Sequence, residues 1–293
     1  MTRAEREERD GYLFVSPWMA GFLLFILYPL LASLYYAFCD YSVLRRPIWT
    51  GLDNFTTLFH DKVFWTSLYN TAYFAVFFLP ASLVLSLALA MLLNAKVRGQ
   101  AIYRTIFYLP SLLPLVATAV LFLWVFDGDN GVVNNLLKLG GFQGPGWLSD
   151  PAWTKFTIIL LSLWGVGNTM IIYLASLQEV PESLYEAAEL DGARAWERLK
   201  AVTLPMISPV ILFNTLMGII GALQVFTVPF VMFPGGQPAD STYFYTAYLY
   251  DNAFKYHNMG YACAMGWVMF LIILVLTLIS RQLSEKHVYY GGG

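Results

Sequence analysis

Charged residues are scarce in this sequence. Only 12% of the 293 residues are Asp, Glu, Lys or Arg, about half the share found in soluble domains, whereas 58% are hydrophobic. The net charge is −2 and the basic residues form no long runs, so the electrostatic surface of a nucleic-acid-binding protein is missing. The composition predicts a lipid bilayer as the environment and no nucleic-acid partner.

Residues and motifs of catalytic sites are also few. Cys39 and Cys263 stand far apart, which excludes a disulfide scaffold and a zinc spacing, and the three histidines are scattered over loops and ends. The sequence contains no phosphate-binding loop, no nucleophile elbow and no His-Glu metal motif. We therefore expect no catalytic residue, no metal site and no cofactor bound by this chain.

Six apolar segments are long enough to cross a bilayer, which requires about 20 residues. All 17 basic and 19 acidic residues fall outside these segments. The sequence therefore predicts an all-α polytopic membrane protein, with a transmembrane domain at residues 12–280 between terminal segments 1–11 and 281–293. The six predicted segments are Tyr12–Phe38, Trp65–Leu93, Thr105–Phe126, Phe156–Leu177, Pro205–Phe233 and Gly260–Ser280.

The distribution of Lys and Arg predicts the orientation. The two ends and the loops 94–104 and 178–204 hold 11 of the 17 basic residues, so this side is expected to be cytoplasmic. Lys96, Arg98 and Arg104 weigh most because their loop has no acidic residue. Both termini are thus predicted to be cytoplasmic.

Small residues and prolines inside the segments predict packing and bends. Ser82, Ser86 and Ala90 recur every four residues and indicate a close helix contact. Each intramembrane proline removes a backbone donor and favours a bend. These prolines are Pro29, Pro80, Pro110, Pro114, Pro209 and Pro229.

The predicted cytoplasmic loop 178–204 is typical of a helix, a tight turn and a second helix. Pro181 suits a first helical turn, and Gly192 can adopt the positive φ that ends a helix. From these features alone the loop is either an interfacial connector or a docking element.

The motifs Glu186-Ala187-Ala188, Asp191-Gly192-Ala193 and Leu204-Pro205 closely resemble the EAA loop of the inner-membrane permeases of binding-protein-dependent ATP-binding-cassette importers. Further motifs extend the resemblance over nearly the whole chain, to the sugar-permease branch with maltose- and glycerol-phosphate-type subunits. These motifs include Gly51-Leu52-Asp53-Asn54-Phe55, Asn70-Thr71, Trp147-Leu148 and Met259-Gly260-Tyr261-Ala262.

The resemblance implies a type I permease fold and a bacterial plasma-membrane location. It implies four kinds of partner: a second homologous permease, two ATPase copies that bind ATP and magnesium, an external solute-binding protein and the bilayer. The ATPase would dock on the EAA loop. The residues implied in docking are Glu186, Ala187, Ala188, Asp191, Gly192 and Ala193.

Sugars are bound by aromatic faces and by amide and hydroxyl groups. Two spans carry such groups in regions that, in related sugar permeases, face the central cavity. The alternative is that these polar groups only join helices by hydrogen bonds. The candidate residues are Trp164, Asn168, Thr169, Asn214, Gln224, Phe226 and Thr227.

The expected function is import of a sugar or oligosaccharide by alternating access, with ATP hydrolysis in a partner subunit. Glycerol phosphate or another polyol is an alternative substrate. A secondary carrier and a membrane anchor are alternative functions, although a carrier usually keeps ionisable groups inside its spans and the predicted spans have none.

Overall fold

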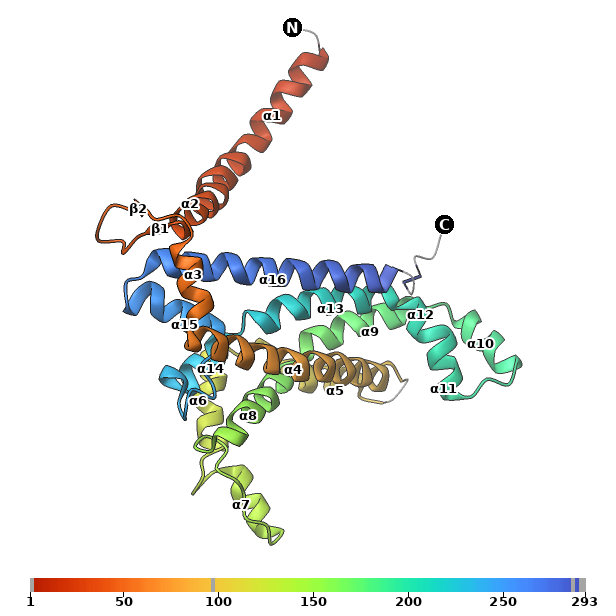
Figure 1. The fold of residues 1–293 in the computed structure, drawn as a ribbon. Coiled ribbons are helices and arrows are strands. Elements are labelled where there is room, and N and C mark those ends of the chain that lie inside the picture. The colour runs from red at the N-terminus through yellow and green to blue at the C-terminus, as the bar shows by residue number, and fades with distance from the viewer. Residues whose placement is uncertain (1–2, 96–97, 286–287, 290–293) are drawn as a thin grey trace. The chain divides into compact units, whose positions relative to one another are not determined.

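The computed structural model describes residues 3–95, 98–285 and 288–289, and it is mainly helical (Figure 1). Lys96, which contributes to the predicted orientation, and residues 286–287 and 290–293 of the predicted C-terminal tail lie outside the described residues. The chain forms two compact units. Unit 1 is Met1–Asp61 with Leu249–Leu271, and unit 2 is Lys62–Tyr248 with Ile272–Gly293.

Unit 1 holds the first helices and a short β-ribbon. β1 and β2 pair antiparallel, with Cys39 opposite Trp49. Two helices, α15 and α16, belong partly to each unit. The elements are α1 Arg3–Phe22, a π-helical turn Leu23–Leu27, α2 Tyr28–Ala37, β1 Cys39–Asp40, β2 Ile48–Trp49, α3 Asp53–His60, α15 Tyr245–Tyr250, a π-helical turn Asp251–Lys255 and α16 Met259–Glu285.

Unit 2 holds the remaining helices, and Figure 1 places α9 and α13 side by side. Its elements are α4 Lys62–Asn94, α5 Gln100–Tyr108, a 3₁₀ turn Leu109–Leu112, α6 Leu115–Val125, α7 Val132–Leu139, α8 Pro151–Trp164, α9 Gly167–Glu179, α10 Glu182–Leu190, α11 Ala195–Arg198, a π-helical turn Leu199–Thr203, α12 Leu204–Met206, α13 Ser208–Leu223, α14 Thr227–Met232 and a 3₁₀ turn Pro234–Gly236.

Four described helical segments are long and apolar enough to cross a membrane. Two more candidates are bent pairs: α5 with its 3₁₀ turn meets α6 at 99°, and α8 meets α9 at 45°. Counting each bent pair as one span gives the six predicted spans. The four segments that meet these conditions singly are Asp10–Ala37, Lys62–Asn94, Ser208–Met232 and Met259–Glu285.

Several helices begin earlier than the predicted spans, and some of these extensions include a basic residue that was predicted to lie in a loop. α5 begins at Gln100 and α8 at Pro151, so Arg104 and Lys155 are helical residues instead of loop residues. A Lys or Arg near the end of a span can extend its charged head toward water while its stem stays in an apolar region. The position of a charge therefore marks the edge of the lipid core and not the first residue of the helix.

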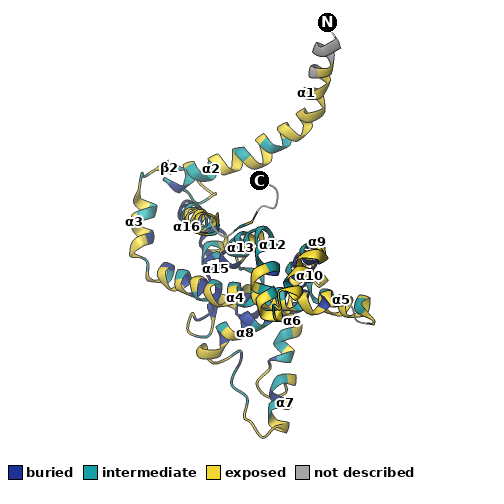
Figure 2. Cartoon of the chain, turned by 90° about the vertical axis from the view of Figure 1, so that its right-hand side faces the viewer, coloured by how far each residue is buried: buried dark blue, intermediate teal, exposed yellow. Residues whose placement is uncertain are grey.

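The N-terminal span is poorly packed within unit 1. No residue in the most apolar window of Asp10–Ala37 is buried, and Figure 2 shows α1 as mostly exposed. Where α2 ends, Asn54 Nδ2 donates to the carbonyls of Ala37 (3.0 Å) and Cys39 (2.9 Å). A Cβ at Gly260 would overlap the carbonyl oxygen of Cys39, so the two backbones meet closely there. These contacts explain why Asn54 and Gly260 occur in their motifs, Gly51-Leu52-Asp53-Asn54-Phe55 and Met259-Gly260-Tyr261-Ala262.

α4 is the central helix of unit 2. Its predicted small-residue stripe is buried, with Ser86 and Ala90 fully inaccessible, and α4 packs against α9. The packing prediction is therefore confirmed. Pro80 lies inside this helix without interrupting it.

The motif Asn70-Thr71 fixes the loop that follows α14. Asn70 Nδ2 donates to the carbonyls of Asp240 (2.8 Å) and Tyr243 (3.2 Å), and Thr71 Oγ1 accepts the backbone N–H of Tyr245 (2.9 Å). Lys155 Nζ donates to Asn70 Oδ1 at 2.8 Å. Burial raises the pKa of the Tyr245 phenol. Two polar residues on α4 thus hold the loop against it.

Candidate functional site

Three interrupted helices meet at one cavity in unit 2, with a volume of about 520 Å³. The break between α5 and α6 contributes Ser111 and Leu113, the break between α8 and α9 contributes Trp164, and the break between α13 and α14 contributes Gln224 and other residues. Non-helical backbone at membrane depth is tolerated where it is buried in protein or lines a wet cavity. The convergence of three breaks marks this cavity as the candidate substrate site.

Two of the three breaks have a local cause in the sequence. Leu113 is extended because it precedes Pro114, which begins the turn into α6. A Cβ at Gly167 would lie 2.9 Å from Phe107 O, so only glycine permits the close approach of α9 to the end of α5. Phe226 has φ −139° and ψ −60°, outside the helical region, and separates α13 from α14. The backbone itself therefore shapes the cavity.

Five of the seven predicted substrate residues line the cavity: Trp164, Asn168, Gln224, Phe226 and Thr227. In the described part of the chain, neither the Asn168 nor the Gln224 side-chain amide has a hydrogen-bond partner, and both residues are exposed. Within this chain these two amides therefore do not join helices. Their donors and acceptors are open to a ligand.

The other two predicted residues lie elsewhere. Thr169 follows Asn168 by one residue and is turned by about 100° around α9. Asn214 precedes the cavity residue Gly221 by seven residues, about 10 Å along α13, and is 5% exposed beside Tyr173. Its Nδ2 is buried without a partner among the described residues.

The cavity also has lining residues that sequence reasoning missed. Phe74 and Phe78 of α4 stack on each other, with ring centroids 4.9 Å apart, and Ser111 and Ser162 add hydroxyl groups. Ser111 donates to Tyr108 O at 2.7 Å and keeps its acceptor capacity. The pair Pro110-Ser111 was a usable signal, since a proline inside a span favours a bend and a bend at membrane depth is tolerated where it lines a cavity.

The loop between α9 and α13 is a helix-turn-helix. Gly192 has φ +79°, which confirms the predicted left-handed turn. The N–H of Ala193 donates to Ala188 O (2.9 Å), and the N–H of Gly192 donates to Glu189 O (3.0 Å). These two bonds form a Schellman motif, which satisfies the last carbonyls of α10. The turn therefore has a defined geometry.

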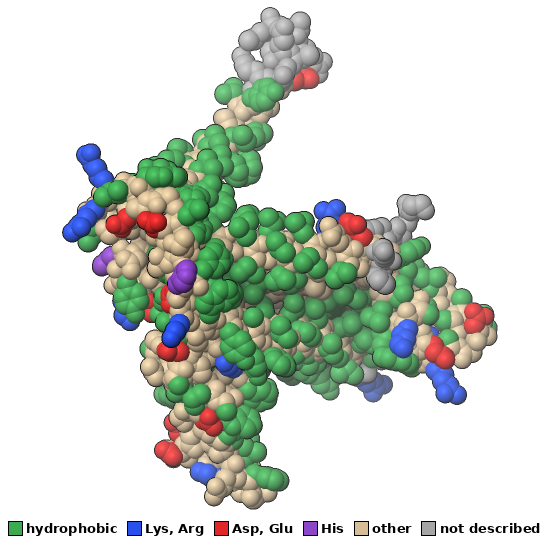
Figure 3. Space-filling view, viewed as in Figure 1, with side chains coloured by type: hydrophobic (Ala, Val, Ile, Leu, Met, Phe, Trp, Pro, Cys, Tyr) green, Lys and Arg blue, Asp and Glu red, His purple; other side chains and the backbone are tan. Residues whose placement is uncertain are grey.

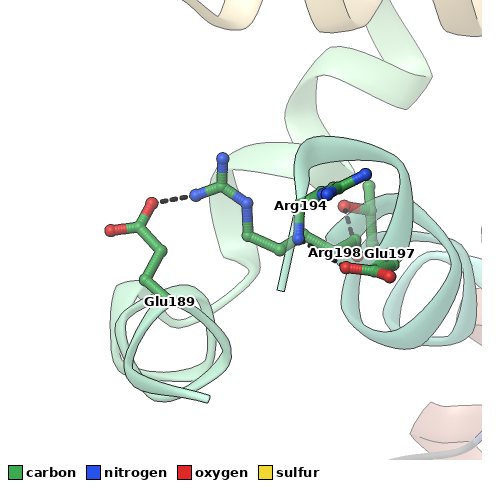
Figure 4. A network of polar contacts seen from close by, with 5 residues as sticks. Glu189, Arg194, Glu197 and Arg198 are labelled. Carbon is green, nitrogen blue, oxygen red and sulfur yellow. Dashed lines mark hydrogen bonds and ion pairs between the residues drawn. The ribbon is translucent and has the colours of Figure 1, made fainter. Parts of the chain in front are cut away.

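Side chains join α10 to the segment that follows it. Arg198 pairs with Glu189 across the turn, and Glu197 accepts the backbone N–H of Arg194 at 2.6 Å (Figure 4). The Tyr185 hydroxyl lies 3.1 Å from Thr203 Oγ1 in the π-helical turn. The two short helices are thus tied to each other and to the segment that leads into α13.

The six predicted docking residues lie together on this loop. Glu186, Ala187, Asp191 and Gly192 are exposed, whereas Ala188 and Ala193 are half-buried at the Schellman turn. The exposed side chains Leu190 and Trp196 were not among the predicted residues. Charged side chains gather over α10 and α11, at the end of unit 2 away from α7 (Figures 1 and 3).

Among the described residues, no group of three His, Cys, Asp or Glu could hold a metal ion, and Cys39 and Cys263 are free thiols. Unit 2 contains the cavity between broken spans and the polar loop that continues through α12 into α13. These features define a membrane transport component.

The chain belongs to the family described as binding-protein-dependent transport system inner membrane component, whose model matches residues 82–287. It is 42% identical to a Bacillus subtilis protein named "Probable ABC transporter permease protein YesP", with 97% of this chain and 93% of that protein covered. It is 39% identical to the lactose transport system permease protein LacF of Rhizobium radiobacter, with 94% of each chain covered.

A solved structure supports the fold. A chain from a crystal structure of a bacterial alginate ABC transporter, in complex with an alginate pentasaccharide-bound periplasmic protein, matches with a TM-score of 0.84. The two chains are 26% identical, and 96% of each is covered. The match confirms the predicted type I permease fold.

Proposed function

We propose that this chain is the permease subunit of an ATP-driven importer that carries a sugar or oligosaccharide into the cell by alternating access. The observation that carries the proposal is the cavity at the three helix breaks. Trp164 and Phe226 offer aromatic faces there, and Asn168 and Gln224 offer unpaired amides. Aromatic faces and amides are the groups that bind the apolar face and the hydroxyls of a sugar.

The relatives support the same substrate class, because they include a lactose transport system permease and a chain of an alginate transporter. Glycerol phosphate is a weaker alternative, because no Lys or Arg is among the described residues that line the cavity to neutralise a phosphate. A neutral polyol shares the hydroxyl chemistry of a sugar. A secondary carrier is disfavoured because the same lining contains no ionisable side chain that could couple ion flow.

The proposed assembly contains a second homologous permease, two ATPase copies that bind ATP and magnesium, and an external solute-binding protein. In this assembly the ATPase seats on the loop: small Ala187 and Ala188 permit close approach, Gly192 provides the turn and Glu186 offers a carboxylate contact. Asp191 and Ala193 flank the turn. The chain lies in a bacterial plasma membrane with both termini cytoplasmic.

Substrate uptake by the reconstituted transporter tests the proposal. Gln224→Leu and Trp164→Ala should each reduce uptake, because an unpaired sugar hydroxyl costs about 1 to 3 kcal/mol. Basal ATP hydrolysis and the yield of the complex should stay unchanged. Thr169→Val, outside the cavity on the neighbouring helix face, is the matched control.

Normal uptake by both cavity variants would remove these residues from the path. Loss of the complex itself would make them packing residues. Uptake by the isolated chain in ATP-free vesicles with an ion gradient would replace the proposed importer by a secondary carrier.

A further inference from the structure

A second pocket in unit 2 lies at the base of the helix-turn-helix loop, where α13 begins. Its volume is about 310 Å³, and it shares no lining residue with the 520 Å³ cavity. The π-helical turn contributes Lys200, α13 contributes Ser208, Ile211 and Leu212, and the segment after α16 contributes Val288. All of these residues belong to one unit, so the pocket is a feature of unit 2 itself.

The pocket has one charged end. In the part of the chain that the structure describes, no carboxylate lies within ion-pair distance of Lys200 Nζ, and none lines the pocket. The ammonium lies 4.8 Å from the centroid of the Trp196 ring. A cation–π contact leaves the positive charge in place, so the charge remains available to an anion.

The rest of the pocket offers little to a polar ligand. The Ser208 hydroxyl donates to Pro205 O (2.6 Å) and accepts the N–H of Tyr289 (2.9 Å), and Thr215 donates to a carbonyl of its own helix. The apolar walls beyond Lys200 include Ile211 and Leu212, and Ser284 adds one hydroxyl group. A free inorganic phosphate needs several donors around it, and this pocket supplies one cation, one hydroxyl and hydrocarbon.

The pocket has a cationic group at one end and apolar walls beyond it, and a phospholipid has a phosphate head group followed by acyl chains in the same order. Trp196 is 61% exposed beside Lys200, as is typical of a residue at the membrane interface, and α13 then runs into the apolar span. Basic pockets at this level bind anionic head groups. The volume accommodates about ten water-sized groups, enough for a phosphate and the start of one acyl chain.

We infer that this pocket binds an anionic phospholipid, with its phosphate against Lys200 and an acyl chain against Ile211 and Leu212. The inference does not depend on the proposed substrate. Because the walls include the segment that joins the loop to α13, a bound lipid contacts the part of the chain that connects the two candidate sites.

Native mass spectrometry of the purified full-length chain tests the inference. The chain in detergent is titrated with phosphatidylglycerol and, separately, with phosphatidylcholine. We expect tighter binding of phosphatidylglycerol, and Lys200→Gln should weaken that binding roughly fivefold, which corresponds to about 1 kcal/mol for one cation near a lipid phosphate. Lys200→Arg should retain it, and phosphatidylcholine binding should not change.

Lys138→Gln is the matched control, because it removes the same charge from α7, which lies far from this pocket (Figure 1). The Nζ of Lys138 donates to Asp129 O at 3.2 Å. This variant should bind phosphatidylglycerol as the unmodified chain does. Equal weakening by both Gln variants would mean that net charge alone acts, and would overturn the inference. Equal binding of the two lipids, or displacement of phosphatidylglycerol by millimolar inorganic phosphate, would overturn it too.

Discussion

Replacing Gly192 with valine should uncouple ATP hydrolysis from the substrate path. Gly192 has φ +79°, and a left-handed conformation costs an L-residue about 1–2 kcal/mol, with a β-branched side chain at the upper end. A Cβ at this position would meet no atom within 4 Å, so no contact is gained or lost. The cost is therefore purely conformational and should reduce the population of the native turn roughly 5- to 30-fold.

The effect should be local, because the turn is exposed and lies outside the spans. Asparagine tolerates the left-handed region better than other non-glycine residues, so Gly192→Asn is the matched control and should retain most of the coupling. The assay is substrate-stimulated ATP hydrolysis by the assembled transporter in nanodiscs, with complex yield measured in parallel. A Gly192→Val complex that assembles and hydrolyses ATP at the normal stimulated rate would refute the reasoning.

The remaining predictions concern the fold, the loop and the orientation. Asn70→Leu leaves two backbone carbonyls without their donor and should lower the free energy of unfolding by about 1 to 3 kcal/mol. The melting temperature in detergent should fall, and an unchanged value would contradict the described role. Glu189→Gln should change coupled ATP hydrolysis less than about fivefold, because the pair with Arg198 is partly exposed to solvent and such pairs contribute about 0–1 kcal/mol. In single-cysteine variants, an impermeant thiol reagent should label position Asp129 from outside intact cells and not position Gly99; the reverse pattern would overturn the predicted orientation.

The number and approximate positions of the spans were predictable, because the bilayer imposes a length and an absence of charge that a sequence displays directly. The breaks were predictable only in part. Pro110 and Pro114 lie at the 99° bend, yet Pro80 lies inside an uninterrupted helix. A single proline removes one backbone bond, and its effect depends on whether neighbouring helices hold the segment straight. The positions of neighbouring helices belong to the tertiary structure and cannot be read from a local sequence pattern.

The candidate site was predictable to a similar degree. The chemistry of sugars points to Trp164 and Gln224, and the structure places both at the cavity. Asn214 has the same chemistry and lies about 10 Å away along α13. The break that brings Gln224 to the cavity contains no proline, so its position could not be read from the sequence. Depth along a span depends on where the helix stops, and that is decided by packing.

α13 joins the loop to the cavity by an uninterrupted helix of 16 residues, about 24 Å long. A helix of this kind transmits rotation as well as translation. Inserting one residue anywhere within it would move the Gln224 end by about 1.5 Å and turn it by about 100°, leaving every loop contact intact while pointing the amide away from the ligand. The number of residues in α13 therefore fixes the direction of the Gln224 side chain relative to the loop. Insertions that the loops tolerate should not occur within this helix.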